Sequence, residues 1–557
     1  MSSIGSTADL IFANGAVYTV DAARSWAQAV AVESGRIVAV GTDVDIRGCV
    51  GPQTEVVDLR GRMLVPGFQD AHVHPVGGGL DLLRCDLHAL HDLDAYLDAI
   101  RAYAEANPDR EWILGGGWAM DVFPGGSPTK ELLDSVARDR LVFLSSRDGH
   151  SAWVNGRTLE VAGVTEATPD PPDGRIQRDE RGAPSGTLHE GADEIVSRLL
   201  PRAAPDEVYA GLIKGQEFLH SLGITAWQDA IVDEDIDEDN FDAYVTAAGR
   251  GTLTARVVAA LWWDRHRGKD QIAELEDLRD RGSVGRFSPT SVKIMQDGII
   301  ENYTAATLTS YLDARGDETG NTGISYVEPE ALNGYVTELD ARGFQVHFHA
   351  LGDRAVREAL DALQAAREAN GRNDLRHHLA HLQIVHPDDL PRFRELDAVA
   401  NVQALWAAHE DQMDELTIPF IGPERAGWQY PFASLVRAGA MLAMGSDWSV
   451  STPDPLDQIH VAVNRVMPAD YVYGNDNTTV FIPEERIDLP TALAAFTMGS
   501  AYVNHLDADT GSIEVGKYAD LAVLDRNIFE QPVDQIGDAT IDLTYVEGAR
   551  VFESASA

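Results

Sequence analysis

Five stretches of the chain end an apolar run with a side chain that can bind a metal ion. They are LVPGFQDAHVHP, SVKIMQDG, VHFHALGD, LAHLQ and LAMGSDWS, and the candidate ligands are His72, His74, Lys293, His349, His381 and Asp447. Residues two apart in a strand point to the same side, so His72 and His74 can bind one ion together. Imidazole and carboxylate groups bind zinc, which activates water for hydrolysis. The pattern therefore predicts a metal-dependent hydrolase.

The segments that must position these ligands alternate between apolar strands and amphipathic helices. We expect strands at 63–68, 223–228, 255–263, 291–295, 344–350, 376–382, 399–406 and 440–446, with helices such as 205–223 and 352–370 between most of them. This alternation is typical of βα units. Eight such strands predict an α/β fold, a (β/α)8 TIM barrel, whose site lies at the carboxyl ends of the strands. The candidate ligands fall at that end of strands one, four, five, six and eight.

The residue pattern at both ends of the chain differs from that of the middle. Short β-rich segments with NG and SGR turns fill the first 60 residues, and similar segments return after GSIEVG near the end. We predict a small β-sandwich built from both termini, with residues 1–60 as its first part and 491–557 as the last helix and its second part. The barrel then spans 61–490. A long insertion at about 77–205 follows strand one, and we predict that it forms a lid or substrate-shaping subdomain.

Composition narrows the class of partner. The chain has 557 residues, 44% of them hydrophobic, which is enough for a full core, but its formal net charge is -45. Such a field repels phosphate backbones and anionic membrane surfaces, so we expect a small-molecule substrate and neither nucleic acid nor membrane as a partner. No apolar run reaches the roughly 18 residues of a membrane span. We expect the acidic run at 233–240 to be a solvated loop.

Cysteine usage and the first residues bear on the compartment. Only Cys49 and Cys85 occur, with no CxxC pair, so a disulfide framework is excluded and a reducing cytoplasm is favoured. The N-terminus has no basic segment followed by an apolar core, so no signal peptide is expected. We predict a cytoplasmic protein.

Taken together, the motifs resemble the amidohydrolase superfamily, and within it the branch of YtcJ-like proteins and N-substituted formamide deformylases. The matching pieces, in order, are VPGFQDAHVHP, VKIMQDGIIENYTAA, HALGDRA, LAHLQ, GSDWSVSTPDPL, LPTALAAFTMGSA and GSIEVGKYADLAVLD. They span nearly the whole length. An HxH pair preceded by PGF-x-D is a specific signal, whereas GSD alone is not.

The resemblance implies a role for each candidate ligand. His72 and His74 would bind a buried zinc ion with Asp447, and His349 and His381 would bind a second, more exposed ion. Lys293 would bridge the two as a carboxylated lysine, which requires a neutral amine of the kind that burial favours. His347 shares a strand face with His349, and His377 and His378 precede His381, but HALGD and LAHLQ favour His349 and His381. The family also forms homodimers, which we expect here.

The implied chemistry is hydrolysis by a metal-activated hydroxide. Bound zinc lowers the pKa of its water to about 7, and the resulting hydroxide attacks a carbonyl carbon. Asp447 would act first as general base and then as general acid towards the leaving nitrogen. His150, in SSRDGHSAWVN, resembles a family histidine that approaches the substrate, and would stabilise the carbonyl oxygen.

The expected substrate is an N-substituted formamide or a similar small, apolar amide, because DGIIENYTAA and LAHLQIVHP resemble the deformylase subgroup. Four further side chains are predicted to bind it: Trp118, Trp153, Glu301 and Trp406. A cyclic amide, a carbamate or a deamination substrate on the same site is the nearer alternative, since the fold does not choose the substrate. A non-catalytic binding protein is the more distant alternative, and the intact ligand set argues against it.

Overall fold

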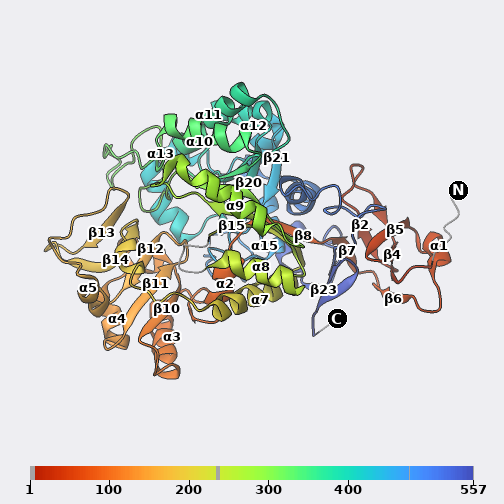
Figure 1. Cartoon of the computed structure of the whole chain (residues 1–557), viewed down its shortest axis with the longest axis horizontal. Helices are drawn as coiled ribbons and strands as arrows, with labels where there is room; N and C mark the ends of the chain where they lie inside the picture. Colours follow the sequence, from red (N-terminus) through yellow and green to blue (C-terminus); the bar gives the residue numbers. More distant parts are fainter. Residues whose placement is uncertain (1–6, 234–238, 476, 556–557) are drawn as a thin grey trace.

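A parallel eight-stranded sheet lies at the centre of the computed structural model, which describes residues 7–233, 239–475 and 477–555 (Figure 1). Its strands follow one another in chain order: β8 (Phe68–Val73), β15 (Ile224–Val232), β16 (Arg256–Trp262), β17 (Phe287–Met295), β18 (Gln345–Ala350), β19 (His378–His381), β20 (Val399–Val402) and β21 (Met441–Met444). Just past β21, the backbone N–H of Asp447 donates to the carbonyl of His72 in β8 at 2.8 Å. Because this bond joins the two outer strands, the sheet forms a nearly closed (β/α)8 barrel.

The first predicted strand is the one that the structure corrects. Residues 63–68 were predicted to open the barrel, but Met63–Pro66 forms β7 of a different sheet and the barrel strand begins at Phe68. Gly67 lies between the two sheets. Its N–H donates to the carbonyl of Asp520, next to a strand of the terminal sheets, and the N–H of Phe68 donates to the carbonyl of Gly223, next to β15. A Cβ at Gly67 would come within 2.4 Å of the Thr225 side chain, so this crossing requires glycine.

The other predicted strands and both named helices are observed, with small shifts at their ends. The segment 399–406 is a strand only as far as Val402, because a 3-10 turn occupies Ala404–Trp406. Helices between and after the barrel strands include α7 (Pro205–Ser221), α8 (Asn240–Arg250), α9 (Ile272–Gly282), α10 (Pro329–Ala341), α11 (Asp353–Asn370), α12 (Leu390–Leu396), α13 (Ile418–Ala426), α14 (Phe432–Ala438) and α15 (Pro455–Asn464). Pro205 at the first position of α7, followed by two acidic residues, is a typical helix start.

The insertion after β8 and the short helix α2 (Pro75–Asp81) carries a sheet of its own. Six strands pair in the order β13-β14-β12-β11-β10-β9. Their bounds are β9 (Cys85–Asp86), β10 (Trp112–Trp118), β11 (Leu141–Ser146), β12 (Ser151–Val154), β13 (Gly174–Arg178) and β14 (Pro184–Glu190), and helices α3 (Leu93–Ala106), α4 (Lys130–Ala137) and α5 (Gly156–Ala162) accompany them. The last residue of β14 and the turn between β11 and β12 reach the mouth of the barrel, as the cavity lining shows.

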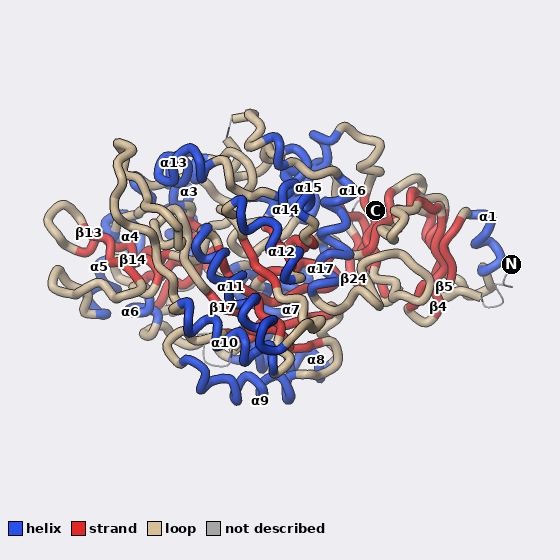
Figure 2. Tube along the Cα trace, turned by 90° about the horizontal axis from the view of Figure 1, so that it is seen from above, coloured by secondary structure: helices blue, strands red, loops and turns tan. Residues whose placement is uncertain are grey.

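Two further sheets are built from the ends of the chain, and the second of them combines both ends. The first contains β1 (Leu10–Ala13), β4 (Ala29–Glu33), β5 (Arg36–Gly41) and β6 (Glu55–Asp58). The second contains β2 (Ala16–Tyr18), β3 (Trp26–Ala27) and β7 from the N-terminal part, with β22 (Leu521–Leu524), β23 (Ile541–Val546) and β24 (Ala549–Glu553) from the C-terminal part. Phe12, Val30, Leu64, Val523 and Tyr545 pack in one core between them. Figure 2 shows these sheets and the insertion at opposite ends of the barrel, and of these parts only the insertion contributes residues to the large cavity at the mouth of the barrel.

Two expectations about polarity have different outcomes. Among the described residues, no helix combines the length and the apolar character that crossing a membrane requires. The acidic run at 233–240 cannot be assessed as a loop, because residues 234–238 lie outside the described part of the chain.

Candidate metal centre

Asp447 lies at the centre of the predicted ligand set, at the carboxyl ends of the barrel strands. Its Oδ1 is 3.1 Å from Nε2 of His72 and 3.0 Å from Nε2 of His74. Its Oδ2 is 3.9 Å from Nδ1 of His381, and Nζ of Lys293 is 3.4 Å from Nε2 of His72. The structure therefore brings together the ends of three strands, β8, β17 and β19, and the loop after β21, which are four of the five stretches that the sequence singled out.

The backbone around these ligands is held in an uncommon conformation. Asp447 and His381 have positive φ angles of 57° and 78°, which side chains other than glycine adopt mainly where the surroundings enforce it. The His381 N–H donates to Oε1 of Gln403 at 2.7 Å. The buried Asp70 carboxylate accepts the N–H groups of His72 at 3.0 Å and Ser446 at 3.1 Å. Asp70 thus fixes the ends of β8 and β21 against each other.

His381 provides the test of whether these residues fit a metal ion. Both of its ring nitrogens are buried, and neither has a hydrogen-bond partner among the described residues. Buried polar atoms nearly always have a partner, so an unpaired imidazole of this kind fits a ligand whose ion completes it. Ligand atoms of His72, His381 and Asp447 all lie within 4.8 Å of one another. This donor set of imidazoles and a carboxylate suits a divalent ion such as zinc.

The ammonium group of Lys293 is destabilised by its position. The side chain is 3% exposed, and burial lowers its pKa to about 7, although Asp447 and Asp229 act in the opposite direction. A substantial fraction of the amine is therefore neutral near pH 7, the form that reacts with carbon dioxide. This property fits the bridging role that the family resemblance implies.

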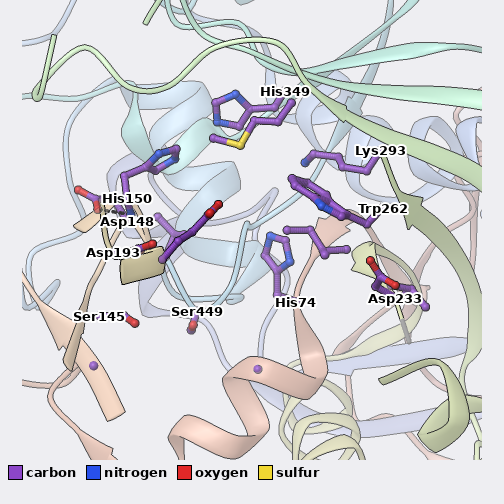
Figure 3. Close-up of a pocket in the computed structure, with 18 of the residues that line it drawn as sticks. His74, Ser145, Asp148, His150, Asp193, Asp233, Trp262, Lys293, His349 and Ser449 are labelled. Carbon is purple, nitrogen blue, oxygen red and sulfur yellow. Dashed lines mark hydrogen bonds between the residues drawn. The ribbon is translucent and has the colours of Figure 1, made fainter. Parts of the chain in front are cut away.

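His349 lines the cavity, and His347 lies beneath it. Figure 3 shows His349 opposite His74 and beside Lys293 at the cavity wall. Its Nδ1 is 3.4 Å from Oδ1 of Asp297, a buried carboxylate that accepts the N–H groups of Ala306, Leu351 and Gly352. His347 is fully buried and does not line the cavity. Of the two alternatives on this strand, the geometry favours His349 as the ligand.

His377 and His378, the alternatives to His381, form hydrogen bonds away from the ligand cluster. Nε2 of His377 is 3.0 Å from Asp340, and Nε2 of the buried His378 is 2.9 Å from Oε1 of Gln228. Neither histidine lines the cavity around Asp447. His381 is therefore the histidine of this segment that the structure brings to the site.

His150 reaches the site from the insertion. Its ring lies 5.5 Å from that of His349, and its Nδ1 is 3.1 Å from both carboxylate oxygens of Glu190 (Figure 3). Burial lowers the pKa of His150, but Glu190 more than offsets this effect and the pKa rises to about 9. Asn302 and Thr304 donate to Glu190 at 2.9 and 2.8 Å. His150 is thus an imidazolium near neutral pH, with Nδ1 committed to Glu190.

Glu190 is the functional residue that sequence reasoning missed. It ends β14, and its partners Asn302 and Thr304 belong to the loop after β17, so the contact depends on how the insertion docks on the barrel. Burial raises the pKa of Glu190, but His150 and these donors lower it further, to about 2. The HEG sequence around it has no spacing that distinguishes it from a surface carboxylate.

The four predicted substrate contacts divide into two pairs. Trp118 and Trp153 are fully buried in the insertion, where their indoles donate to the carbonyls of Leu144 and Thr129. They line neither cavity at the site, so their predicted role in substrate binding is corrected to core packing. Trp406 stacks on His381 at 5.4 Å, and Glu301 accepts the Thr417 hydroxyl at 2.5 Å. Both line the smaller cavity beside the ligands.

Two cavities meet at the ligand cluster. The larger has a volume of about 900 Å³ and contains Asp447, His150 and Glu190 together with the side chains of Leu114 and Trp262. The smaller, about 60 Å³, shares side chains with it that include His150, His349, His381, Asp447 and Val450. The rest of its wall combines apolar side chains, namely Ile299, Leu351, Trp406 and Met413, with polar ones, namely Glu301, Gln383, Glu410, Gln412 and Tyr430. Water-sized and substrate-sized molecules can therefore approach the same ligands from two sides.

Comparison with known proteins decides the family. The model that describes the amidohydrolase family matches residues 55–552, nearly the whole chain. The chain belongs to the amidohydrolase family. This amidohydrolase is therefore a hydrolase, and the buried cluster around Asp447 is its candidate metal site.

Relatives match this amidohydrolase over almost its full length. Protein LONG AFTER FAR-RED 3 of Arabidopsis thaliana is 32% identical, over 98% of this chain and 92% of its own. YtcJ of Bacillus subtilis is 28% identical, over 98% of this chain and 99% of its own. N-substituted formamide deformylase of Arthrobacter pascens is 28% identical, over 98% of each. These matches place the amidohydrolase in the predicted YtcJ-like branch.

Solved structures share the fold. An uncharacterized metal-dependent hydrolase of Pyrococcus furiosus is 25% identical and superposes with a TM-score of 0.69, over 93% of this chain and 99% of the other. Atrazine chlorohydrolase TrzN of Arthrobacter aurescens, solved in complex with zinc, is 16% identical with a TM-score of 0.53, over 98% of this chain and 95% of its own. These likenesses show that the amidohydrolase shares its overall fold with these proteins.

Proposed function

We propose that this amidohydrolase cleaves the C–N bond of small amides with apolar substituents, with N-substituted formamides as the preferred class. The observation that carries the proposal is the buried cluster around Asp447, in which His381 has two unpaired ring nitrogens. Its likeness to N-substituted formamide deformylase supports the substrate class. We further propose zinc as the metal, since a protein of the same fold holds it.

The proposed ligands would divide between two metal positions. His72, His74 and Asp447 would hold one ion, and His349 and His381 a second, with a carboxylated Lys293 between them. When bound, such ions lower the pKa of a coordinated water and polarise a carbonyl group. The pKa of Lys293, lowered by burial to about 7, supports the carboxylation.

The protein's own groups then move and hold protons. Asp447 has a pKa well below its usual range, because His72 and His74 outweigh the effect of burial, so it is an anion able to accept a proton. It would take the proton of the nucleophile and return it to the leaving nitrogen, as a general base and then a general acid. His150, with Nδ1 held by Glu190, would donate its other N–H to the carbonyl oxygen.

The two cavities would hold different parts of the substrate, the acyl group in the smaller and the amine substituent in the larger. The small chamber offers space for roughly four water-sized groups, enough for a short acyl group. Several of its polar groups are paired, since Arg147 contacts Glu410 and Gln412 and Glu301 contacts Thr417, while the apolar part of its wall includes Leu351, Trp406 and Met413. The 900 Å³ cavity, with Leu114 and Trp262 in its wall, would hold the larger amine substituent.

Steady-state kinetics on acyl-length series test this division. Among N-benzyl amides of increasing acyl length, the zinc-loaded protein should hydrolyse N-benzylformamide fastest. Its kcat/KM should fall at least about tenfold from N-benzylformamide to N-benzylbutyramide. Trp406→Ala and Met413→Ala should each raise the butyramide-to-formamide ratio by about tenfold, because they enlarge the chamber. Leu114→Ala is the matched control, since Leu114 lines only the larger cavity.

The same assays can contradict the proposal. Equal ratios in all three variants would refute the acyl chamber. Turnover of cyclic amides, carbamates or amino-heterocycles without turnover of any formamide would refute the proposed substrate class and favour the alternative one.

A further inference from the structure

His347 lies directly behind a proposed metal ligand. Its Nε2 is 2.8 Å from Nδ1 of His72, and both side chains are buried. The other nitrogen of His72, Nε2, faces Asp447 at 3.1 Å and Lys293 at 3.4 Å. We propose that His347 is a positioning residue that accepts the Nδ1–H of His72 and so presents the Nε2 lone pair to the metal. This inference rests on the metal site of the proposed function.

The direction of the hydrogen bond follows from the chemistry of imidazole. A neutral imidazole carries one proton, and the nitrogen that binds a metal cannot carry it. If Nε2 of His72 binds the ion, Nδ1 holds the proton and must donate, and Nε2 of His347 lies where it can accept. His347 is then protonated on Nδ1, which is buried and has no hydrogen-bond partner among the described residues.

A polar column below His347 holds it in place. Its ring centroid is 4.0 Å from that of His378, whose Nε2 is 2.9 Å from Oε1 of Gln228. Nε2 of Gln228 donates to Gln345 and Asn504, both at 3.0 Å, so its oxygen must accept from His378. The tautomer of His378 is thereby fixed, with its proton on Nε2.

The same column explains why His378 cannot take over the role. Asn401 Nδ2 lies 3.2 Å from Nδ1 of His378 and donates to the carbonyl of Ala71 at 2.9 Å. Both nitrogens of His378 are therefore occupied, and its contact with His347 is ring packing only. His347 alone, among the described residues near Nδ1 of His72, offers a nitrogen lone pair to it.

A partner of this kind acts on metal affinity more than on the fold. Residues that orient a metal ligand through its second nitrogen typically change affinity by about 10- to 100-fold when they are removed. His72 is buried, so the protein atoms around its ring decide between its two tautomers, and Nε2 of His347 is the atom that faces Nδ1. Without His347, Nδ1–H of His72 would lose the one acceptor that the described part of the chain offers it.

Zinc affinity of two variants at one position tests the inference. His347→Leu removes the acceptor, and His347→Gln keeps an amide oxygen near the position of Nε2. By chelator competition, His347→Leu should weaken the tighter zinc site by about 10- to 100-fold, and His347→Gln should recover most of this loss. Both should keep the zinc stoichiometry of the unmodified protein and the visible spectrum of its Co²⁺ form, because no ligand has been removed.

Controls separate this inference from the proposed function. His220→Leu removes another buried histidine, which bonds Ile224 and Thr254 away from the site, and should leave zinc affinity unchanged. Equal affinity in the unmodified protein and His347→Leu, with both folded by thermal melting, would overturn the positioning role. Loss of one zinc equivalent in both His347 variants would instead make His347 a ligand. No zinc binding by the unmodified protein would refute the proposed function itself.

Discussion

Asp447→Asn should lower kcat/KM for formamide hydrolysis by roughly 10³- to 10⁴-fold while the protein stays folded. Asparagine has the shape of the carboxylate but neither its negative charge nor its ability to accept a proton. Oδ1 of Asp447 lies at 3.0 to 3.1 Å from His72 and His74, so the substitution acts at the centre of the cluster. Steady-state kinetics at saturating zinc give the comparison, with zinc content measured in the same samples.

Asp340→Asn is the matched control for Asp447→Asn. Asp340 is a buried carboxylate that pairs with His377, and it lines neither cavity. This variant should keep activity within a few-fold of the unmodified protein. Retention of more than about a tenth of the activity by Asp447→Asn, with zinc bound, would show that another group transfers the proton.

His150→Ala should lower kcat by about 10²- to 10³-fold, the effect of removing one donor to a developing oxyanion. The imidazolium lies at the cavity wall with Nδ1 held by Glu190, which leaves the other N–H for the substrate. Zinc content should not change, because the ligand set is intact. A kcat within threefold of the unmodified value would contradict the role of His150.

The pH dependence of kcat provides a second test of the role of His150. Because the pKa of His150 is raised to about 9, the imidazolium is complete at lower pH and is lost as the pH rises through about 9. We therefore expect kcat to fall above this pH. In Glu190→Gln the fall should begin at a lower pH, since the carboxylate that raises the pKa is gone and burial lowers it. An unmoved alkaline limb would contradict the link between Glu190 and His150.

Most of the site could be predicted from the sequence because its residues belong to short local motifs. His72, Lys293, His349 and His381 each end an apolar strand, and a parallel barrel brings such ends together. The choice between His347 and His349 could not be made from periodicity, since both face the barrel interior. It depends on depth along the axis, which the register of β18 with its neighbours sets.

The predictions that the structure corrects failed for one physical reason, namely contacts between segments that are distant in the sequence. Trp118 was predicted to contact the substrate, yet it packs on Trp153 and Phe123 inside the insertion. Met63–Pro66 is as apolar as a barrel strand, but β7 pairs with β22 from the far end of the chain. Local hydrophobicity cannot distinguish these environments, because each is buried on both sides.

Zinc content by elemental analysis, on protein purified without chelator, tests the central claim most directly. The unmodified protein should contain about two equivalents per chain, as expected for a site with two ions bridged by Lys293. Lys293→Ala should contain about one equivalent or less, because the bridge is lost. About one equivalent in both proteins would contradict the bridged site and favour deaminase-type substrates. No bound metal, and no activity after zinc is added, would contradict the mechanism as a whole.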